Sequence, residues 1–387
     1  MSKEMAVEEH HILADHKRSR MLDATFVVDL DVHINEKPQD LVPFIDPAFR
    51  PVLEFLAEVP WRYLDIPGFA PNHVPWPILP TVNRKTTVFT PEEMRRDLDY
   101  LGVDVGVLFP DSFLLHALIK PPDYALALAR AYNRWLVEYW LADDHGYFGA
   151  LLAPHQDPAV AAGEIRRYAD HPRVKAVFLP SAAVDPLYGN RRYDPLYDAA
   201  EECGLPVVLH SVTAISPVYP FNLHGFETLF AAHILSHGVA MFANLVSMIE
   251  TGVPVRFPKL KVAFTEGGIA WVPWIAMRLD KEYMERRRDV PFLTERPSHY
   301  VERMFFATQP VEEPERMGDI AQLMKLFDGE NCVVFASDWP HHDFDHPDKV
   351  LQIPVSDEAK RKIMGGNAAR LLGLEVPARY GYGLDGR

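Results

Sequence analysis

The stretch TFVVDLDVH, residues 25–33, is a run of apolar residues that ends in Asp31, Val32 and His33. Its Val and Phe content is typical of a β-strand buried inside a protein. Asp31 and His33 are two positions apart, so on a strand their side chains project to the same side. The stretch therefore predicts a buried strand that presents two polar groups near its carboxyl end.

Seven further runs of this kind follow, and they lack the polar alternation of half-exposed strands. They are DVGVLFP (104–110), GYFGALL (146–152), VKAVFLP (174–180), PVVLH (206–210), LKVAFTE (260–266), RMFFAT (303–308) and CVVFASD (332–338). Helical patterns separate them; Thr90, for example, is followed by Pro91 and Glu93, which is a helix start with a capping box. Eight strands alternating with helices predict an α/β fold, a closed (β/α)₈ TIM barrel, with an open doubly wound sheet as the alternative.

Three segments do not follow this alternation of strands and helices. We expect residues 1–23 to form an N-terminal arm, 24–374 the barrel and 375–387 a C-terminal tail. Within the barrel, residues 34–89 are rich in Pro and Trp and show no long helical pattern. An insertion directly after the first strand belongs at the carboxyl mouth of a barrel, where it would act as a substrate lid. A packed excursion that only covers the barrel is the alternative.

The amino-acid composition limits the classes of molecule that we expect the protein to bind. The 387 residues carry a net charge of −15 without a Lys/Arg-rich run, which argues against nucleic acid. No stretch approaches about 18 uninterrupted apolar residues, so we expect no membrane partner. The two cysteines, Cys203 and Cys332, and the polar N-terminus favour the reducing cytoplasm. A small-molecule substrate is the expected partner, and assembly into a homo-oligomer is compatible with this composition.

Ligand-type side chains recur at the carboxyl ends of predicted strands. Strand 1 supplies Asp31 and His33, strand 5 His210, strand 6 Glu266 and strand 8 Asp338. Singly, each has an ordinary explanation: His210 as a hydrogen-bonded core residue, Asp338 as a helix cap, Glu266 as an acceptor for the turn after it. Together they predict a metal at the top of the barrel, because buried polar groups must be neutralised or bonded.

The same residues resemble a known family. Asp31-x-His33, His210, Glu266 before Gly267-Gly268, and Ser337-Asp-Trp-Pro-His341 are similar to the motifs of the amidohydrolase superfamily. The branch typified by aminocarboxymuconate semialdehyde decarboxylase shares stretches such as TGVPVRFPKLKVAFTEGG (251–268), WVPWIAMRLDKEY (271–283), FASDWPHHD (335–343) and GNAARLLGL (366–374). The resemblance covers about residues 24–374 and implies a metal-dependent barrel enzyme, with His341 near the metal.

Two positions differ from those decarboxylases, which commonly carry histidine where this chain has Asp31 and Glu266. Relatives with such an acidic variant resemble dinuclear iron or iron–manganese oxygenases, and others resemble hydrolases. His237, in a helical segment after strand 5, is a further ligand candidate. The number of candidate ligands leaves one or two metal ions open, and a second ion could be held if Glu266 or Asp338 bridges and His237 joins.

The donor set bears on the metal and the reaction. Carboxylates and imidazoles without cysteine favour Fe²⁺ or Mn²⁺, and Zn²⁺ is compatible. We expect first a hydrolase acting on a small cyclic or heteroaromatic substrate, at a C–N or C–C bond or by displacing a substituent from an sp² carbon. Metal-activated water would attack, Asp338 would accept its proton, and Glu266 or His237 would assist the leaving group. The alternatives are a dinuclear oxygenase on the same ligands, a non-oxidative decarboxylase, and a barrel whose metal is only structural.

Overall fold

The computed structural model describes residues 20–58, 90–212, 226–341 and 343–380 of the chain. Its centre is a single eight-stranded sheet in the order β1 to β8, in which every neighbouring pair is parallel. The strands are β1 (Val28–Ile34), β2 (Val105–Pro110), β3 (Tyr147–Leu152), β4 (Val174–Pro180), β5 (Val207–His210), β6 (Val262–Thr265), β7 (Phe305–Ala307) and β8 (Val333–Val334). Nearly all strand residues are buried, as expected for strands covered on both faces.

Hydrogen bonds between β1 and the segment after β8 join the two edges of the sheet. The Leu30 amide donates to the Phe335 carbonyl at 3.0 Å, and the Asp338 amide donates to the Asp31 carbonyl, also at 3.0 Å. The His33 amide donates to the Trp339 carbonyl at 2.7 Å. The predicted (β/α)₈ barrel is therefore confirmed.

The eighth strand is shorter than expected. The sequence predicted a strand over 332–338, but the regular ladder ends at Val334. Beyond it the backbone leaves extended geometry, because Asp338 adopts a left-handed conformation with φ of 64°. The amide of Ser337 bonds the Asp29 carboxylate instead of a neighbouring strand. This irregular stretch is the one that carries Asp338 to the mouth of the barrel.

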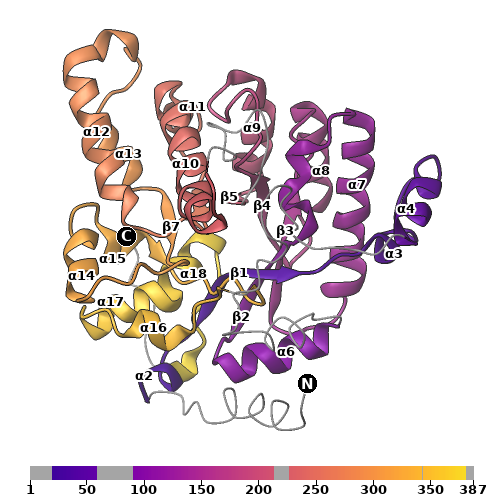
Figure 1. The fold of residues 1–387 in the computed structure, drawn as a ribbon, viewed down its shortest axis with the longest axis horizontal. Coiled ribbons are helices and arrows are strands. Elements are labelled where there is room, and N and C mark those ends of the chain that lie inside the picture. Colours follow the sequence, from indigo (N-terminus) through magenta and orange to yellow (C-terminus); the bar gives the residue numbers. More distant parts are fainter. Residues whose placement is uncertain (1–19, 59–89, 213–225, 342, 381–387) are drawn as a thin grey trace.

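Helices cover the outside of the strands (Figure 1). They are α2 (Arg20–Asp23), α3 (Pro38–Leu41), α4 (Arg50–Ala57), α6 (Pro91–Leu101), α7 (Pro122–Trp135), α8 (Pro158–Tyr168), α9 (Asp194–Glu202), α10 (Leu229–Glu250), α11 (Val253–Arg256), α12 (Trp271–Arg286), α13 (Pro297–Val301), α14 (Gly318–Met324), α15 (Gly329–Cys332), α16 (Pro347–Leu351), α17 (Asp357–Arg361) and α18 (Asn367–Leu372). Short 3₁₀ or π turns are η1 (Ser112–Leu118), η2 (Leu136–Trp140), η3 (Arg191–Tyr193), η5 (Arg287–Asp289), η6 (Lys362–Gly366) and η7 (Ala378–Tyr380). The predicted cap of α6 is present, since Thr90 Oγ1 accepts the Glu93 amide at 3.2 Å.

The insertion after β1 is described in part. Its first residues form α3 and α4, and Glu36, just before α3, is 1 % exposed. The segment 59–89, on which the lid prediction rests, lies outside the described residues, so the lid stays a prediction. The same holds for residues 1–19 of the expected arm and 381–387 of the expected tail.

One helix within the described ranges, over Phe230–Glu250, is long and apolar enough to span a membrane, with a mean hydropathy of 1.4. Just over half of that window, 56 %, is buried inside the fold. A core helix of a barrel has the same properties, so this helix is weak evidence for a membrane. The expected absence of a membrane partner stays a prediction.

Candidate metal centre

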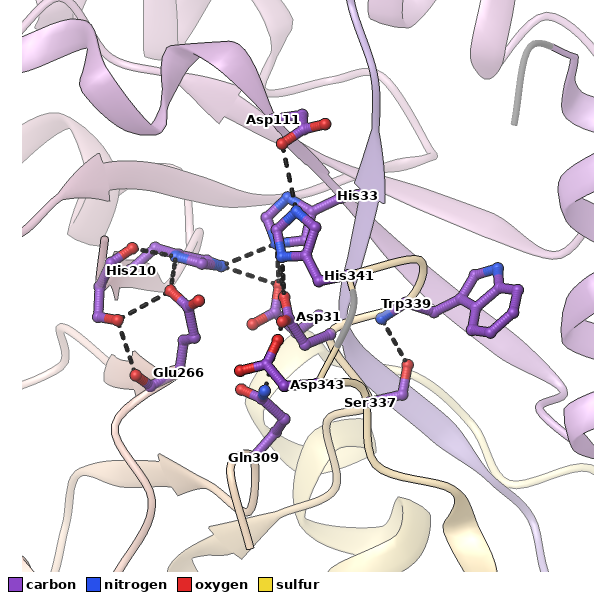
Figure 2. A network of polar contacts seen from close by, with 12 residues as sticks. Asp31, His33, Asp111, His210, Glu266, Gln309, Ser337, Trp339, His341 and Asp343 are labelled. Atoms are coloured by element: carbon purple, nitrogen blue, oxygen red, sulfur yellow. Dashed lines mark hydrogen bonds and ion pairs between the residues drawn. The ribbon is translucent and has the colours of Figure 1, made fainter. Parts of the chain in front are cut away.

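Four of the predicted ligands meet at the carboxyl end of the barrel. Asp31 and His33 come from β1, His210 from the end of β5 and Asp338 from the segment after β8, and all four are fully buried. One donor atom of each lies within 4.8 Å of the others, so the group could hold a metal ion. Figure 2 shows the histidine rings converging on Asp31.

Backbone carbonyls set the tautomers of both histidines. His33 Nδ1 lies 2.8 Å from the Pro110 carbonyl, and His210 Nδ1 lies 2.7 Å from the Ser211 carbonyl. Because a carbonyl only accepts, each Nδ1 carries hydrogen, and each Nε2 of a neutral ring carries a lone pair. The two Nε2 atoms face each other at 3.1 Å. Two lone pairs at that distance repel unless a cation lies between them, which is the arrangement expected of metal-binding histidines.

The spacing of the donors bears on whether they could share one ion. Asp31 Oδ1 is 3.2 Å from His33 Nε2 and 3.0 Å from His210 Nε2. Asp338 Oδ1 is 3.1 Å from His33 Nε2. With bonds of about 2.1 Å, neighbouring ligands are about 3.0 Å apart in an octahedron but about 3.4 Å apart in a tetrahedron. The measured distances of 3.0 to 3.2 Å fall between these two values, so the donors are spaced as ligands of one ion.

The electrostatics also favour a cation. Burial alone would raise the pKa of Asp31, but His210 and His33 hold it well below its usual range. Burial and His341 lower the pKa of His33, yet Asp31 and Asp338 raise it overall to about 10. Asp31 Oδ2 is buried and accepts no hydrogen bond from the described residues. The group therefore attracts positive charge, and a divalent metal would supply that charge where the imidazoles otherwise take up protons.

Local backbone geometry places these side chains. The pairing of β1 with β2 shifts register between Asp29 and Val32, a bulge that re-aims the side chains beside it. Asp29 accepts the amides of Asp31 at 3.1 Å and Ser337 at 2.8 Å, and so ties β1 to the segment that carries Asp338. Asp338 and Glu266 both have positive φ, 64° and 58°. Such strain in non-glycine residues is concentrated at functional positions.

Glu266 lies below His210 in the view of Figure 2. Its Oε2 is 3.2 Å from His210 Nδ1, the nitrogen opposite the ligand pair, and accepts the Ser211 hydroxyl at 2.8 Å. A donor atom of Glu266 also falls within 4.8 Å of donors of Asp338 and His341, which form a second group that could hold an ion. His210 holds the pKa of Glu266 below its usual range together with His237, although burial would raise it.

The alternative role of Glu266, as acceptor for the following turn, receives no support from the amides of residues 268–270. The Gly268 amide donates to the Gln309 carbonyl at 3.1 Å, and the Ile269 amide donates to Glu312 at 2.9 Å. The Ala270 amide also donates to Glu312. These three amides therefore do not bond the Glu266 carboxylate, which instead contacts His210 Nδ1 and the Ser211 hydroxyl.

His237, on α10, lies farther out than the other candidates. Its Nε2 is 3.8 Å from Glu266 Oε1, and it is 5 % exposed. Burial lowers its pKa to about 4, although Glu266 acts in the opposite direction. An imidazole beside a carboxylate is suited to metal binding or proton transfer, and both predicted roles of His237 stay predictions.

Glu266→Gln should lower turnover or metal content at least about tenfold, because it removes the negative charge that orients His210 through Nδ1. Glutamine keeps the size of the side chain, so the fold should be retained. Metal per chain by elemental analysis and steady-state kinetics on the same preparation are the measurements. Unchanged metal content and turnover would assign Glu266 to a purely structural role.

Sequence reasoning missed Asp111, which directly follows β2. Its Oδ1 lies 3.2 Å from His341 Nε2, and the opposite nitrogen of that ring, Nδ1, lies 2.8 Å from Asp338 Oδ1. Asp111 is 3 % exposed. The rule that selected the other candidates, a polar residue at the carboxyl end of a buried strand, also applies to it. Gln309, after β7, was missed as well, and its Nε2 donates to Asp338 Oδ2 at 3.3 Å.

The sequence is similar to those of known proteins. Residues 28–374 match the amidohydrolase family. A 2-amino-3-carboxymuconate-6-semialdehyde decarboxylase from Dictyostelium discoideum is 25 % identical over 303 residues, 75 % of this chain and 77 % of that protein. A gamma-resorcylate decarboxylase from Rhodococcus jostii is 27 % identical over 281 residues, 66 % of this chain and 80 % of that protein.

A solved structure of a dihydroxybenzoic acid decarboxylase from Polaromonas sp., with bound manganese and the inhibitor 2-nitroresorcinol, is similar in fold. The TM-score is 0.61 at 18 % identity, covering 92 % of this chain and all of that one. At this identity the likeness concerns the fold, with its strand ends at a common mouth.

Proposed function

The chain belongs to the amidohydrolase family, and on that premise we propose that it is a metal-dependent, non-oxidative decarboxylase of a small aromatic carboxylic acid. The observation that carries the proposal is the buried group of Asp31, His33, His210 and Asp338, with its two facing Nε2 atoms. The similar proteins with named reactions are decarboxylases, which makes the hydrolase that the sequence first suggested the weaker reading. The decarboxylase alternative takes its place.

The four residues would hold one divalent ion, and manganese is the ion bound in the Polaromonas enzyme. Such an ion would supply positive charge that neutralises the substrate carboxylate. Complete burial of these side chains also keeps bulk water from competing for the ion.

Asp338 is the residue that we assign to proton transfer. Burial and, to a smaller degree, the charge of Glu266 raise its pKa to about 6, although His341 and His33 act in the opposite direction. A carboxyl group with such a pKa can hold a proton and deliver it. In the proposed reaction the proton passes to the ring carbon that bears the substrate carboxylate. The bond to that carboxylate then breaks, its electron pair restores the aromatic ring, and CO₂ leaves.

The other residues orient Asp338. Gln309 donates to Oδ2, and His341 Nδ1 lies 2.8 Å from Oδ1. Each oxygen of the carboxylate thus has a neighbouring side chain. The backbone of Asp338 is tied to β1 through the Asp31 carbonyl. A fixed acid can meet the ring carbon in one geometry, which is where the protein contributes to the rate.

The test uses the manganese-loaded protein and a panel of hydroxybenzoic acids with the hydroxyl group ortho to the carboxylate. Matched benzamides and methyl esters are included. We expect CO₂ release in a one-to-one ratio with the hydroxyarene, and in D₂O one deuterium at the carbon that carried the carboxylate. Cleavage of the amides or esters without CO₂ would replace the proposal with hydrolysis. Oxygen uptake in step with turnover would replace it with oxygenation.

A further inference from the structure

We infer that Asp111 is a positioning residue that holds His341 against Asp338, and that Glu36 and Asn35 keep Asp111 in place for this role. The inference rests on the proposed function only for the part that Asp338 plays in the reaction. It adds to the site the carboxylate of the residue that directly follows strand β2, which lies outside the group of four ligands.

His341 lies between two carboxylates. Its Nε2 is 3.2 Å from Asp111 Oδ1, and its Nδ1 is 2.8 Å from Asp338 Oδ1. Figure 2 shows Asp111 on one side of the ring and the other carboxylates on the opposite side. Each ring nitrogen of His341 thus faces one carboxylate oxygen, so the ring links Asp111 to Asp338.

A third contact restricts the ring. His341 stacks on His33, with ring centroids 4.1 Å apart and an angle of 19° between the planes. The stacking restrains the tilt of the ring, and Asp111 defines its orientation within the plane. In the absence of Asp111 the ring could rotate and present a different edge to Asp338. The 2.8 Å contact between His341 Nδ1 and Asp338 Oδ1 would then be lost.

Hydrogen bonds with neighbouring residues fix the position of Asp111. Glu36 accepts the Asp111 amide at 2.9 Å and the Phe113 amide at 2.8 Å, which fixes the backbone after β2. Asn35 Nδ2 donates to Asp111 Oδ2 at 2.9 Å. That leaves Oδ1 directed at His341.

Burying the Glu36 carboxylate is energetically unfavourable, which argues that this residue has a functional role. Glu36 is 1 % exposed, and burial, together with the nearby Asp111, raises its pKa to about 8. Two acidic groups buried side by side destabilise a fold unless their hydrogen bonds compensate. Here the hydrogen bonds of Glu36 and Asp111 fix the Asp111 carboxylate beside His341.

The first test needs no substrate. In protein with ¹⁵N-labelled histidine, loaded with diamagnetic Zn²⁺, we expect Nε2 of His341 to carry a proton that exchanges slowly, because it faces Asp111. Asp111→Ala should abolish that slow exchange, and Asp111→Asn, which can still accept from Nε2, should restore much of it. The resonance is assigned by its absence in His341→Gln.

The second test is kinetic. Asp111→Ala should lower kcat about 30-fold with KM changed less than about threefold, because the loss of a charge-assisted hydrogen bond disturbs the acid rather than the metal. Asp111→Asn should recover part of kcat. Metal content should stay that of the wild type in both variants. Asp345→Asn is the matched control, since Asp345 is 2 % exposed, accepts the Val311 amide and pairs with Lys349. It should lower the melting temperature but leave the His341 resonance unchanged.

Two results would overturn the inference. One is an Asp111→Ala protein with wild-type kcat and an unchanged His341 resonance. The other is a wild-type metal content of two ions per chain that falls to one in Asp111→Asn, which would make Asp111 and His341 ligands of a second ion. If the wild type releases no CO₂ from the panel but its His341 resonance still depends on Asp111, the proposed function fails and the positioning role stands.

Discussion

His33→Ala and His210→Ala should each remove bound metal and abolish turnover while the barrel stays folded. Both Nε2 atoms point into the group of donors, and both rings are held through Nδ1 by carbonyls of the backbone. Loss of an outer partner of a metal ligand already costs about 10- to 100-fold in affinity. Loss of the ligand itself should cost at least about 100-fold.

The measurements are metal per chain after dialysis, turnover in excess Mn²⁺, and far-UV circular dichroism. His116→Asn is the matched control, because His116 is equally buried and bonds the Ala125 carbonyl away from the four ligands. It should lower thermal stability and leave metal content intact. Full metal occupancy and turnover in either alanine variant would show that the ion binds elsewhere.

Asp338→Asn should lower kcat by at least about a thousandfold, within the range for loss of a general acid. Asparagine retains the shape of the side chain and can still bind a metal weakly through its oxygen, but it has no carboxyl proton to deliver. KM should change much less than kcat, because the substrate carboxylate is bound at the metal. Asp338→Asn is therefore expected to lower kcat more than Asp111→Ala does.

Exchange at the product ring separates acid catalysis from metal loss. Both proteins are loaded with manganese and incubated with the hydroxyarene in D₂O. The wild type should exchange the ring hydrogen at the carbon that accepts the proton, and Asp338→Asn should not. Metal content is measured on the same samples. A variant that holds its metal and still decarboxylates within tenfold of the wild-type rate would limit Asp338 to metal binding.

The barrel could be predicted from the sequence because its signals are local. A buried parallel strand needs a short apolar run, and the chain repeats such runs between helical segments from residue 25 to residue 338. The shared direction of Asp31 and His33 follows from their spacing of two on one strand. That His210 and Asp338 lie near them follows from the topology, since the carboxyl ends of all strands in a barrel meet at one mouth.

Other features depend on contacts between distant segments. Asp111 and His341 are 230 positions apart, and only closure of the barrel between β1 and β8 brings their side chains together. The end of β8 was overestimated for a related reason. Residues 335–338 have the composition of a strand, but Asp338 takes up a left-handed conformation that local propensity disfavours.

The sequence by itself determined the fold class, the common mouth and a set of candidate ligands, because these follow from hydrophobic period and from the position of polar residues at strand ends. Only the tertiary structure decided which nitrogen or oxygen of each side chain faces which neighbour. Glu266 and Asp31 are both strand-end carboxylates, yet Asp31 faces Nε2 of His210 and Glu266 faces Nδ1 of the same ring. That difference arises from backbone angles and barrel closure, which set the orientation of each side chain, whereas the sequence pattern specifies only the face from which the side chain projects.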